Sequence, residues 1–234
     1  MPESGETGLV KEAVAELGRH VGFLLSPTAL HFAAAPPEGA MTPPAGAWAC
    51  IFSFMDGVQE GSPASFSRAA PGCAGAVCYF GFENLPVVPA AIYLAGRERL
   101  KKDAGLAAAF YRDVQPAPAR DSHLVFRRLD TTPDTARIEV VNLWVEALSL
   151  SALHALANYD RAGNDNVIIP FSSGCQSIWT LPFKEKSNGN PRAVAGSLDP
   201  TVRRYLPDGA ISFSLPAGRL VEMCENIPGS FMSR

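Results

Sequence analysis

The chain has 234 residues, of which 47% are hydrophobic and 18% charged, and its 20 basic and 23 acidic side chains give a formal net charge of −3 at pH 7. This composition is typical of a globular protein and excludes an intrinsically disordered one. The charges are scattered, with no basic patch for nucleic acid, and no apolar run reaches the roughly 20 residues of a membrane span. The first residues are acidic and lack the apolar region of a secretory signal. We therefore expect a cytoplasmic protein with no nucleic-acid or membrane partner.

The first half of the chain alternates helical and extended patterns with proline-rich breaks. An apolar stripe predicts an amphipathic helix over 7–18, with Thr7 as its cap. A strand is predicted over 28–32, and the proline and glycine residues of 36–46 predict a loop. Further along, the pattern predicts a buried helix over 48–55, a strand over 63–68, a short apolar helix over 74–80 and a helix over 103–114.

Strand patterns are more frequent in the second half. Val, Ile and Trp side chains predict strands over 123–129 and 137–145, and a buried strand over 167–169 follows a helix around 150–157. The tail has a polar loop over 187–191, a short helix beginning at 199–200, a strand over 210–214 and a helix over 216–225. These elements together predict an α+β fold, a mixed sheet with flanking helices.

Two places along the chain share one order of elements. In each, a helix, a turn and a short strand lead into a Gly-Cys pair, first Gly72-Cys73 and then Gly174-Cys175. The length suits one domain over 1–234, and the similarity suggests an internal duplication of two β-α-β units with halves at about 21–115 and 120–234. If the halves face each other, we expect both Gly-Cys loops to lie near one cleft.

The cysteines are the main candidates for chemistry. The five cysteines form an odd set in a chain of ordinary size, which favours reduced thiols over a disulfide framework. Glycine permits a sharp turn, and a helix N-terminus lowers the pKa of a thiol, a pattern that fits Cys73 and Cys175. The alternative is that both are small buried hydrophobic side chains. A thiol nucleophile needs a base, for which His154 is the candidate.

A metal or iron-sulfur site is a second possibility for the thiols. Cys73 and Cys78 form a C-x-x-x-x-C pair that, with Cys50 and Cys175, supplies four thiolates. If 74–78 is helical, residues five apart point about 140° apart, which is poor geometry for one tetrahedral ion. None of the histidines has the spacing of a ligand pair: His20, His31, His123 and His154.

Hydrogen-bonding side chains are dense in residues 158–166, beside the strand that leads to Cys175. Asn164, Asp165 and Asn166 exceed what a turn requires, and Gln176 adds a polar group next to the cysteine. These residues suggest a polar ligand pocket. The alternative is a well-hydrogen-bonded surface loop.

Other binding signatures are weak. Gly72 and Gly75 give G-x-x-G, which is neither a dinucleotide fingerprint nor a phosphate-binding loop. Asp199 and Arg203 lie one helical turn apart, which favours a surface ion pair over an anion clamp.

Five segments carry a resemblance to a known family: W-A-C-I-F-S-F, G-C-A-G-A-V-C-Y-F-G-F, L-A-N-Y-D-R-A-G-N-D-N-V-I-I-P-F-S-S-G-C-Q-S-I, S-L-D-P-T-V-R-R-Y and I-S-F-S-L-P. In this order they resemble the domain-of-unknown-function family DUF169 over about 21–231. The resemblance implies a prokaryotic protein of a family without an assigned activity. The family pattern matches this chain at ten candidate site positions: Cys50, Cys73, Asn164, Asp165, Asn166, Gly174, Cys175, Gln176, Asp199 and Arg203. Cys78 does not match a cysteine of that pattern.

The sequence therefore predicts a protein that binds a small molecule or cofactor near the two Gly-Cys loops. Two alternatives stay open: a cysteine-dependent redox or metal enzyme, and a structural or partner-binding protein. The sequence identifies neither the cofactor nor the oligomeric state.

Overall fold

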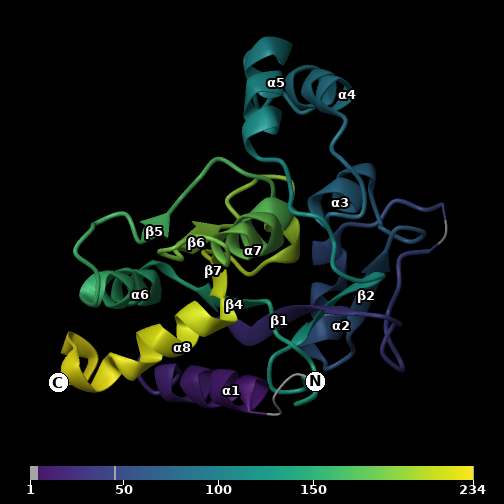
Figure 1. The fold of residues 1–234 in the computed structure, drawn as a ribbon. Coiled ribbons are helices and arrows are strands. Elements are labelled where there is room, and N and C mark those ends of the chain that lie inside the picture. The colour runs from purple at the N-terminus through teal and green to yellow at the C-terminus, as the bar shows by residue number, and fades with distance from the viewer. Residues whose placement is uncertain (1–4, 45, 234) are drawn as a thin grey trace.

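The computed structural model describes residues 5–44 and 46–233 (Figure 1). A seven-stranded sheet has the order β2-β3-β1-β4-β7-β6-β5, with all neighbouring strands antiparallel except β5 and β6, which are parallel. The strands are β1 (Leu25–Ala33), β2 (Ala64–Ser67), β3 (His123–Arg128), β4 (Val140–Val145), β5 (Val167–Ile168), β6 (Ala193–Gly196) and β7 (Ile211–Pro216). The predicted α+β class, with a mixed sheet and flanking helices, is confirmed.

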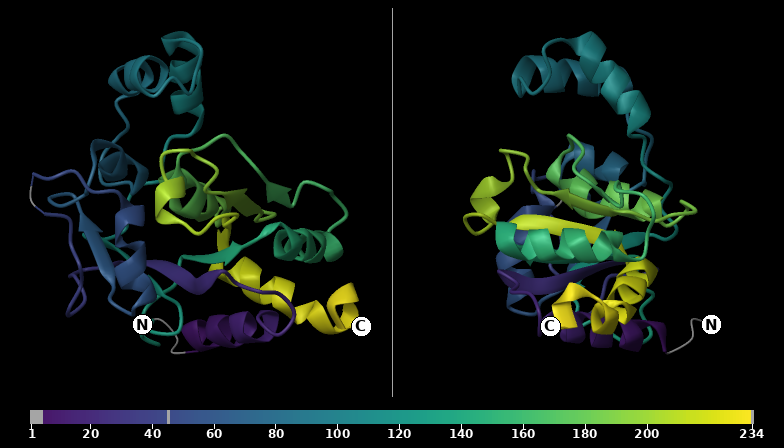
Figure 2. Two further views of the ribbon diagram at one scale, coloured as in Figure 1. Left: turned by 180° about the vertical axis from the view of Figure 1, so that it is seen from behind. Right: turned by 90° about the vertical axis from the view of Figure 1, so that its left-hand side faces the viewer.

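Helices cover both faces of this sheet. Alternate residues of a strand point to opposite faces, so Ala29 and Leu30 on β1 enter two different apolar clusters. The cluster with Ala29 includes α1 (Glu6–Leu17), α6 (Ala147–Tyr159) and α8 (Ala217–Glu225). The cluster with Leu30 includes η1 (Ile51–Phe54), α2 (Met55–Gln59), α3 (Ala74–Tyr79), the π-helix η3 (Gln176–Thr180) and α7 (Leu181–Glu185). Figure 2 shows α1 packed against α8 on the first face.

A helical arm projects from the body of the molecule (Figure 1). It comprises α4 (Val87–Ile92), the π-helix η2 (Tyr93–Arg97) and α5 (Ala104–Asp113), and it has a small apolar core of its own. Only the 103–114 helix of this arm was predicted, because Pro86 and Pro89 indicate a loop. Both prolines lie at the start of α4, where the missing N–H has no partner within the helix.

Several predicted elements need correction. Thr7 lies inside α1 instead of capping it, and its hydroxyl donates to the carbonyl oxygen of Ala136. Trp48 is exposed, because helical structure begins only at Ile51. The helix predicted at 199–200 is a turn followed by the short 3-10 helix η4 (Arg203–Tyr205). The predicted 36–46 loop includes residue 45, which lies outside the described residues. Two further 3-10 turns follow α8: η5 (Ile227–Gly229) and η6 (Phe231–Ser233).

The internal duplication is not confirmed. β2 pairs antiparallel with β3 at one edge of the sheet, whereas β5 pairs parallel with β6 at the other. An α-helix follows Cys73, whereas a π-helix follows Cys175. Among the described helices, none has both the length and the apolar character needed to cross a membrane.

Candidate functional site

The first Gly-Cys loop joins β2 to α3 and is fixed against the segment that precedes η1. The N–H of Ala49 donates to the carbonyl oxygen of Gly72 at 2.9 Å. Gly72 has φ of 90°, and a Cβ there would lie 2.5 Å from the carbonyl oxygen of Ala49, so this position requires glycine. This contact brings Cys50 and Cys73 to the same place.

The second Gly-Cys loop packs on the same segment from another side. A Cβ at Gly174 would lie 2.6 Å from Cε2 of Phe52 and 2.8 Å from Cγ1 of Val202. The Ser177 hydroxyl donates to the carbonyl oxygen of Gly174 at 2.8 Å and accepts from the N–H of Ser197 at 3.0 Å. These contacts fix Cys175 between the Cys50 segment and the loop that carries Asp199.

Cys175 belongs to the apolar cluster on the Leu30 face of the sheet, and Cys50 and Cys73 pack against the same cluster. Burial raises the pKa of Cys175 well above its ordinary value, and Cys50, Cys73 and Asp199 raise it further. Burial is also the main cause that raises the pKa of Cys50, to which Cys73 and Asp199 add. We call Cys50, Cys73, Cys175 and Asp199 the three-thiol site. Cys50 and Cys73 are half-buried, while Cys175 is buried.

Two interpretations of Cys175 were open from the sequence, a thiol with a lowered pKa at a helix N-terminus and a small buried side chain, and the raised pKa agrees with the second. Burial disfavours the thiolate and outweighs the neighbouring N–H groups. Cys73 has the expected position, because it is the N-cap of α3 and its Sγ accepts from the N–H of Ala76 at 3.3 Å.

The helical arm adds polar groups that the sequence did not single out. Burial raises the pKa of Glu98, which follows η2, and the nearby Asp199 adds to this shift. Burial also raises the pKa of Tyr79 and Tyr111, whose side chains influence each other, and Ser173 contacts Tyr79. Asp199 also adds to the raised pKa of Tyr111.

Unusual backbone conformations accumulate around these residues. In the described ranges, Arg99 and Ser197 are the two residues other than glycine with positive φ, at 56° and 59°. Arg99 follows Glu98, and Ser197 lies two positions before Asp199. The π-helices η2 and η3 also adjoin Glu98 and Cys175. Strained backbone and π-helical turns occur often at functional sites.

Buried polar groups without hydrogen-bond partners occur at Gln176, which follows Cys175, and in the strands beneath η3. Gln176 is fully buried, and its Oε1 accepts from the N–H of Ser173 at 2.8 Å, which holds its carboxamide against the loop. Its Nε2 finds no hydrogen-bond partner in the described part of the chain, nor do Oδ1 of Asn142 and Oγ of Ser214 in the sheet beneath η3. A buried donor left unpaired is costly and requires an explanation.

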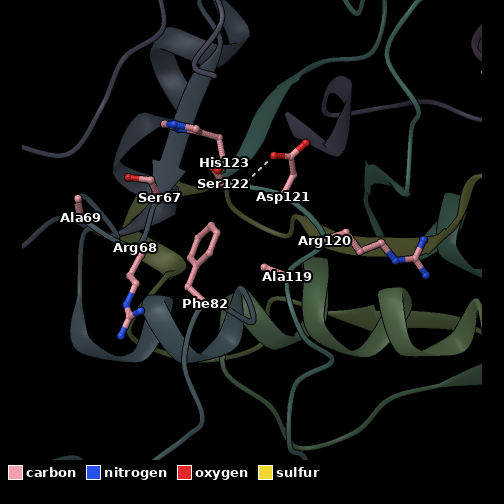
Figure 3. A pocket seen from close by; sticks show the side chains of 9 residues that line it. All are labelled: Ser67, Arg68, Ala69, Phe82, Ala119, Arg120, Asp121, Ser122 and His123. Atoms are coloured by element: carbon pink, nitrogen blue, oxygen red, sulfur yellow. Dashed lines mark hydrogen bonds between the residues drawn. The ribbon is translucent and has the colours of Figure 1, made fainter. Parts of the chain in front are cut away.

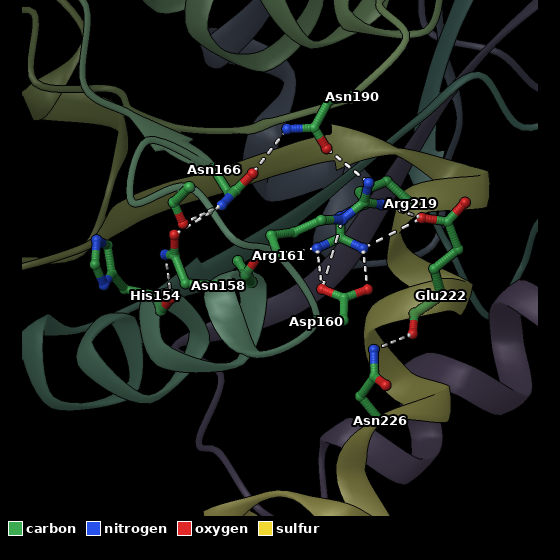
Figure 4. Close-up of polar contacts among 11 residues, drawn as sticks. His154, Asn158, Asp160, Arg161, Asn166, Asn190, Arg219, Glu222 and Asn226 are labelled. Atoms are coloured by element: carbon green, nitrogen blue, oxygen red, sulfur yellow. Dashed lines mark hydrogen bonds and ion pairs between the residues drawn. The ribbon is translucent and has the colours of Figure 1, made fainter.

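The polar loop of 158–166 contributes to a network of hydrogen bonds around Asn166 (Figure 4). Asn166 is buried, where its Nδ2 donates to Oδ1 of Asn158 at 2.9 Å and its Oδ1 accepts from Asn190 at 2.9 Å. Asn164 and Asp165 are exposed in the loop before β5. Asn166 thus belongs to a satisfied network, and the loop lies near the sheet edge opposite to β2.

The expected ion pair between Asp199 and Arg203 does not form. Oδ1 of Asp199 accepts from both the N–H and the hydroxyl of Thr201 at 2.9 Å. The Arg203 guanidinium donates to the carbonyl oxygens of Ser197 and Pro207 at 3.3 Å, and also to that of Ala210. Arg203 therefore fixes the loop that carries Asp199, because no helix forms there to align the two side chains.

The remaining candidate ligands lie outside the three-thiol site. Cys78 is buried and directs its Sγ to the carbonyl oxygens of Ala74 and Asn84, and Cys224 is buried in the core around α8. His154 is exposed on α6 (Figure 4), so it is not the base of a buried thiol. Within the described ranges, no three His, Cys, Asp or Glu side chains are arranged around one metal ion.

A surface depression of about 530 Å³ lies beside β2 and β3, away from the thiols (Figure 3). Its two arginines are engaged with glutamate side chains. Arg68 pairs with Glu83 at 2.9 Å, and Arg120 lies 3.6 Å from Glu139. The cleft predicted at the Gly-Cys loops stays a prediction.

The fold is that of an α+β protein in which the segments carrying Cys50, Cys73 and Cys175 pack against one apolar cluster. The chain belongs to the DUF169 family, described as uncharacterised ArCR, whose sequence profile matches residues 16–226. The resemblance in the sequence is thereby confirmed over nearly the whole chain. No match was found among curated proteins or among solved structures.

Proposed function

We propose that this protein binds a small molecule or cofactor at the three-thiol site. The packing of the segments that carry Cys50, Cys73 and Cys175 on one apolar cluster carries the proposal. Gly72 lies against the carbonyl oxygen of Ala49, and Gly174 lies against the side chains of Phe52 and Val202, and both contacts hold this arrangement.

The unpaired Nε2 of Gln176 supports the same proposal. A bound ligand with an acceptor atom beside Cys175 would satisfy this donor and remove the cost of burying it. The tyrosine hydroxyls of Tyr79 and Tyr111 and the carboxyl group of Glu98 offer further polar contacts on the side of the arm. Such a combination of apolar walls and a few converging polar groups is typical of ligand sites.

The alternatives receive less support. A cysteine nucleophile works as a thiolate, whereas burial raises the pKa of Cys175 and His154 does not serve as its base. A purely structural role leaves the unpaired Gln176 amide without an explanation.

Native mass spectrometry of anaerobically purified protein tests the proposal. We expect the wild-type protein to retain a bound species that Cys175→Ala loses. Cys224→Ala is the matched control, because Cys224 and Cys175 are 7% and 8% exposed and Cys224 lies in the other core. This control is expected to retain the species.

Two results of this measurement would contradict the proposal. A bound species that stays in Cys175→Ala would contradict the proposal, and so would wild-type protein that carries no mass beyond its chain. Circular dichroism of each variant shows whether it remains folded.

A further inference from the structure

Basic side chains from separate parts of the chain converge on Glu139, which precedes β4. The side chain of Glu139 is 4% exposed, and Nζ of Lys186, which follows α7, donates to its Oε2. Nη1 of Arg120 lies 3.6 Å from Oε1 of Glu139, and Nε of Arg137 lies 3.9 Å from the same oxygen. Three cations therefore meet at one buried carboxylate, although the charges are scattered along the sequence.

Glu139 does not need the two arginines as partners. Lys186 already balances its charge and donates a hydrogen bond to it. The distances from Arg120 and Arg137 are longer than those of hydrogen bonds, so Glu139 accepts from neither guanidinium. The side chains of Arg120 and Arg137 are 49% and 58% exposed, which leaves their N–H donors open to a ligand from solvent.

Neighbouring carboxylates do not balance the two guanidinium groups either. Three acidic residues close to them in the chain have partners of their own: Asp121 with the N–H of Ser122 at 2.7 Å, Asp134 with Lys11 at 2.8 Å, and Glu185 with Arg192 at 2.8 Å. Figure 3 shows the Arg120 side chain pointing away from Phe82 and His123. Its Cζ lies 5.1 Å from the centroid of the Phe183 ring, a cation–π contact that holds the guanidinium beside Glu139.

We infer that Arg120 and Arg137 form a binding site for a phosphate group, made of residues other than those of the three-thiol site. Three cations less one carboxylate leave two positive charges, which match a phosphate dianion and exceed the charge of a monocarboxylate. The planar guanidinium donates two parallel hydrogen bonds to such an oxyanion. Free phosphate and an organic phosphate monoester both present this group.

Isothermal titration calorimetry of the full chain with inorganic phosphate, in a chloride buffer without other oxyanions, tests this inference. We expect saturable binding that Arg120→Gln and Arg137→Gln each weaken about tenfold, which corresponds to about 1.4 kcal/mol. Arg137→Lys keeps the charge but loses the planar donor pair, so its affinity is expected to lie between those of wild type and Arg137→Gln. Arg112→Gln is the matched control, because Arg112 is an exposed arginine of α5, and it is expected to keep the wild-type affinity.

Methyl phosphate, titrated in parallel, separates the two sources of the phosphate group. Equal affinity for both ligands indicates an organic monoester, binding of inorganic phosphate alone indicates free phosphate, and either result supports the site. Equal affinity of the wild type and all arginine variants, with unchanged circular dichroism, would mark an adventitious ion only and overturn the inference. Acetate that binds as tightly as phosphate would overturn it too, and so would wild-type protein without saturable phosphate binding.

Discussion

His31 is a buried histidine on β1 with an unsatisfied ring nitrogen. The residue is 5% exposed, Nδ1 lies 3.2 Å from the carbonyl oxygen of Phe32, and Nε2 has no partner among the described residues. Burial lowers the pKa of His31, and Arg127 adds to this effect, while Phe32 and Glu139 oppose it. The folded protein therefore holds His31 neutral.

We expect this histidine to make the protein less stable in mild acid. As pH falls through the ordinary value of 6.5, the unfolded chain takes up a proton that the folded protein refuses. The contribution of neutral His31 to the free energy of unfolding is therefore fully present above that pH. It declines below that pH by up to about 1.4 kcal/mol per pH unit. Urea unfolding between about pH 7 and pH 5 measures this slope, and His31→Gln is expected to reduce it. The exposed His154→Gln serves as control, and an unchanged slope in His31→Gln would refute the explanation.

The candidate residues chosen from the sequence divide into two groups in space. The segments of Cys50, Cys73 and Cys175 pack on one apolar cluster, because Gly72 allows close contact with the backbone of Ala49 and Gly174 allows close contact with the Phe52 ring. The asparagine-rich turn was linked to Cys175 because it is near in sequence. The intervening stretch contains β5, and extended chain advances about 3.3 Å per residue, so that nearness in sequence does not bring the two together.

At the scale of elements, Gly174 controls how the loop before η3 packs on η1 and on the segment before η4. A methyl group at this position would overlap the Phe52 ring and the Val202 side chain, both buried. We expect Gly174→Ala to destabilise the protein by about 1–3 kcal/mol, as overpacking does, and to weaken binding at the three-thiol site. Chemical denaturation measures the first effect.

Gly218→Ala is the control for this substitution. Gly218 lies in α8 with open space where its Cβ would be, so alanine is expected to stabilise the helix by roughly 0.5–1 kcal/mol. Equal stability of the two variants would show that the contact at Gly174 does not hold the loop in place.

Helices with proline near their start were the elements hardest to predict. Pro86 and Pro89 at α4 and Pro182 at α7 read as breaks in the sequence, although proline is tolerated in the first turn. Missing α4 also meant missing Glu98 and its place beside Asp199. The π-helices have no recognised sequence pattern here, and β6 is too short to show strand periodicity.

For the whole molecule, the site depends on the order of strands in the sheet. β2 and β5, which precede the two Gly-Cys loops, lie at opposite edges, yet the loops meet over one face. Local patterns predicted most strands and helices, but they hold no information on long-range pairing. The hypothesis that the two Gly-Cys loops converge therefore came only from the similar order of elements before each of them. The extent of a single domain over 1–234 stays a prediction.

Site-resolved alkylation of anaerobically purified protein tests the central claim most directly. Cys50 and Cys73 are half-buried and accessible to iodoacetamide unless a bound species covers them. We predict that both react about tenfold faster in Cys175→Ala than in wild-type protein or Cys224→Ala, which corresponds to about 1.4 kcal/mol of protection. The buried Cys78 serves as an internal reference that reacts slowly in all three proteins. Equal rates for Cys50 and Cys73 in all three proteins would mean that nothing bound there depends on Cys175, and would contradict the account.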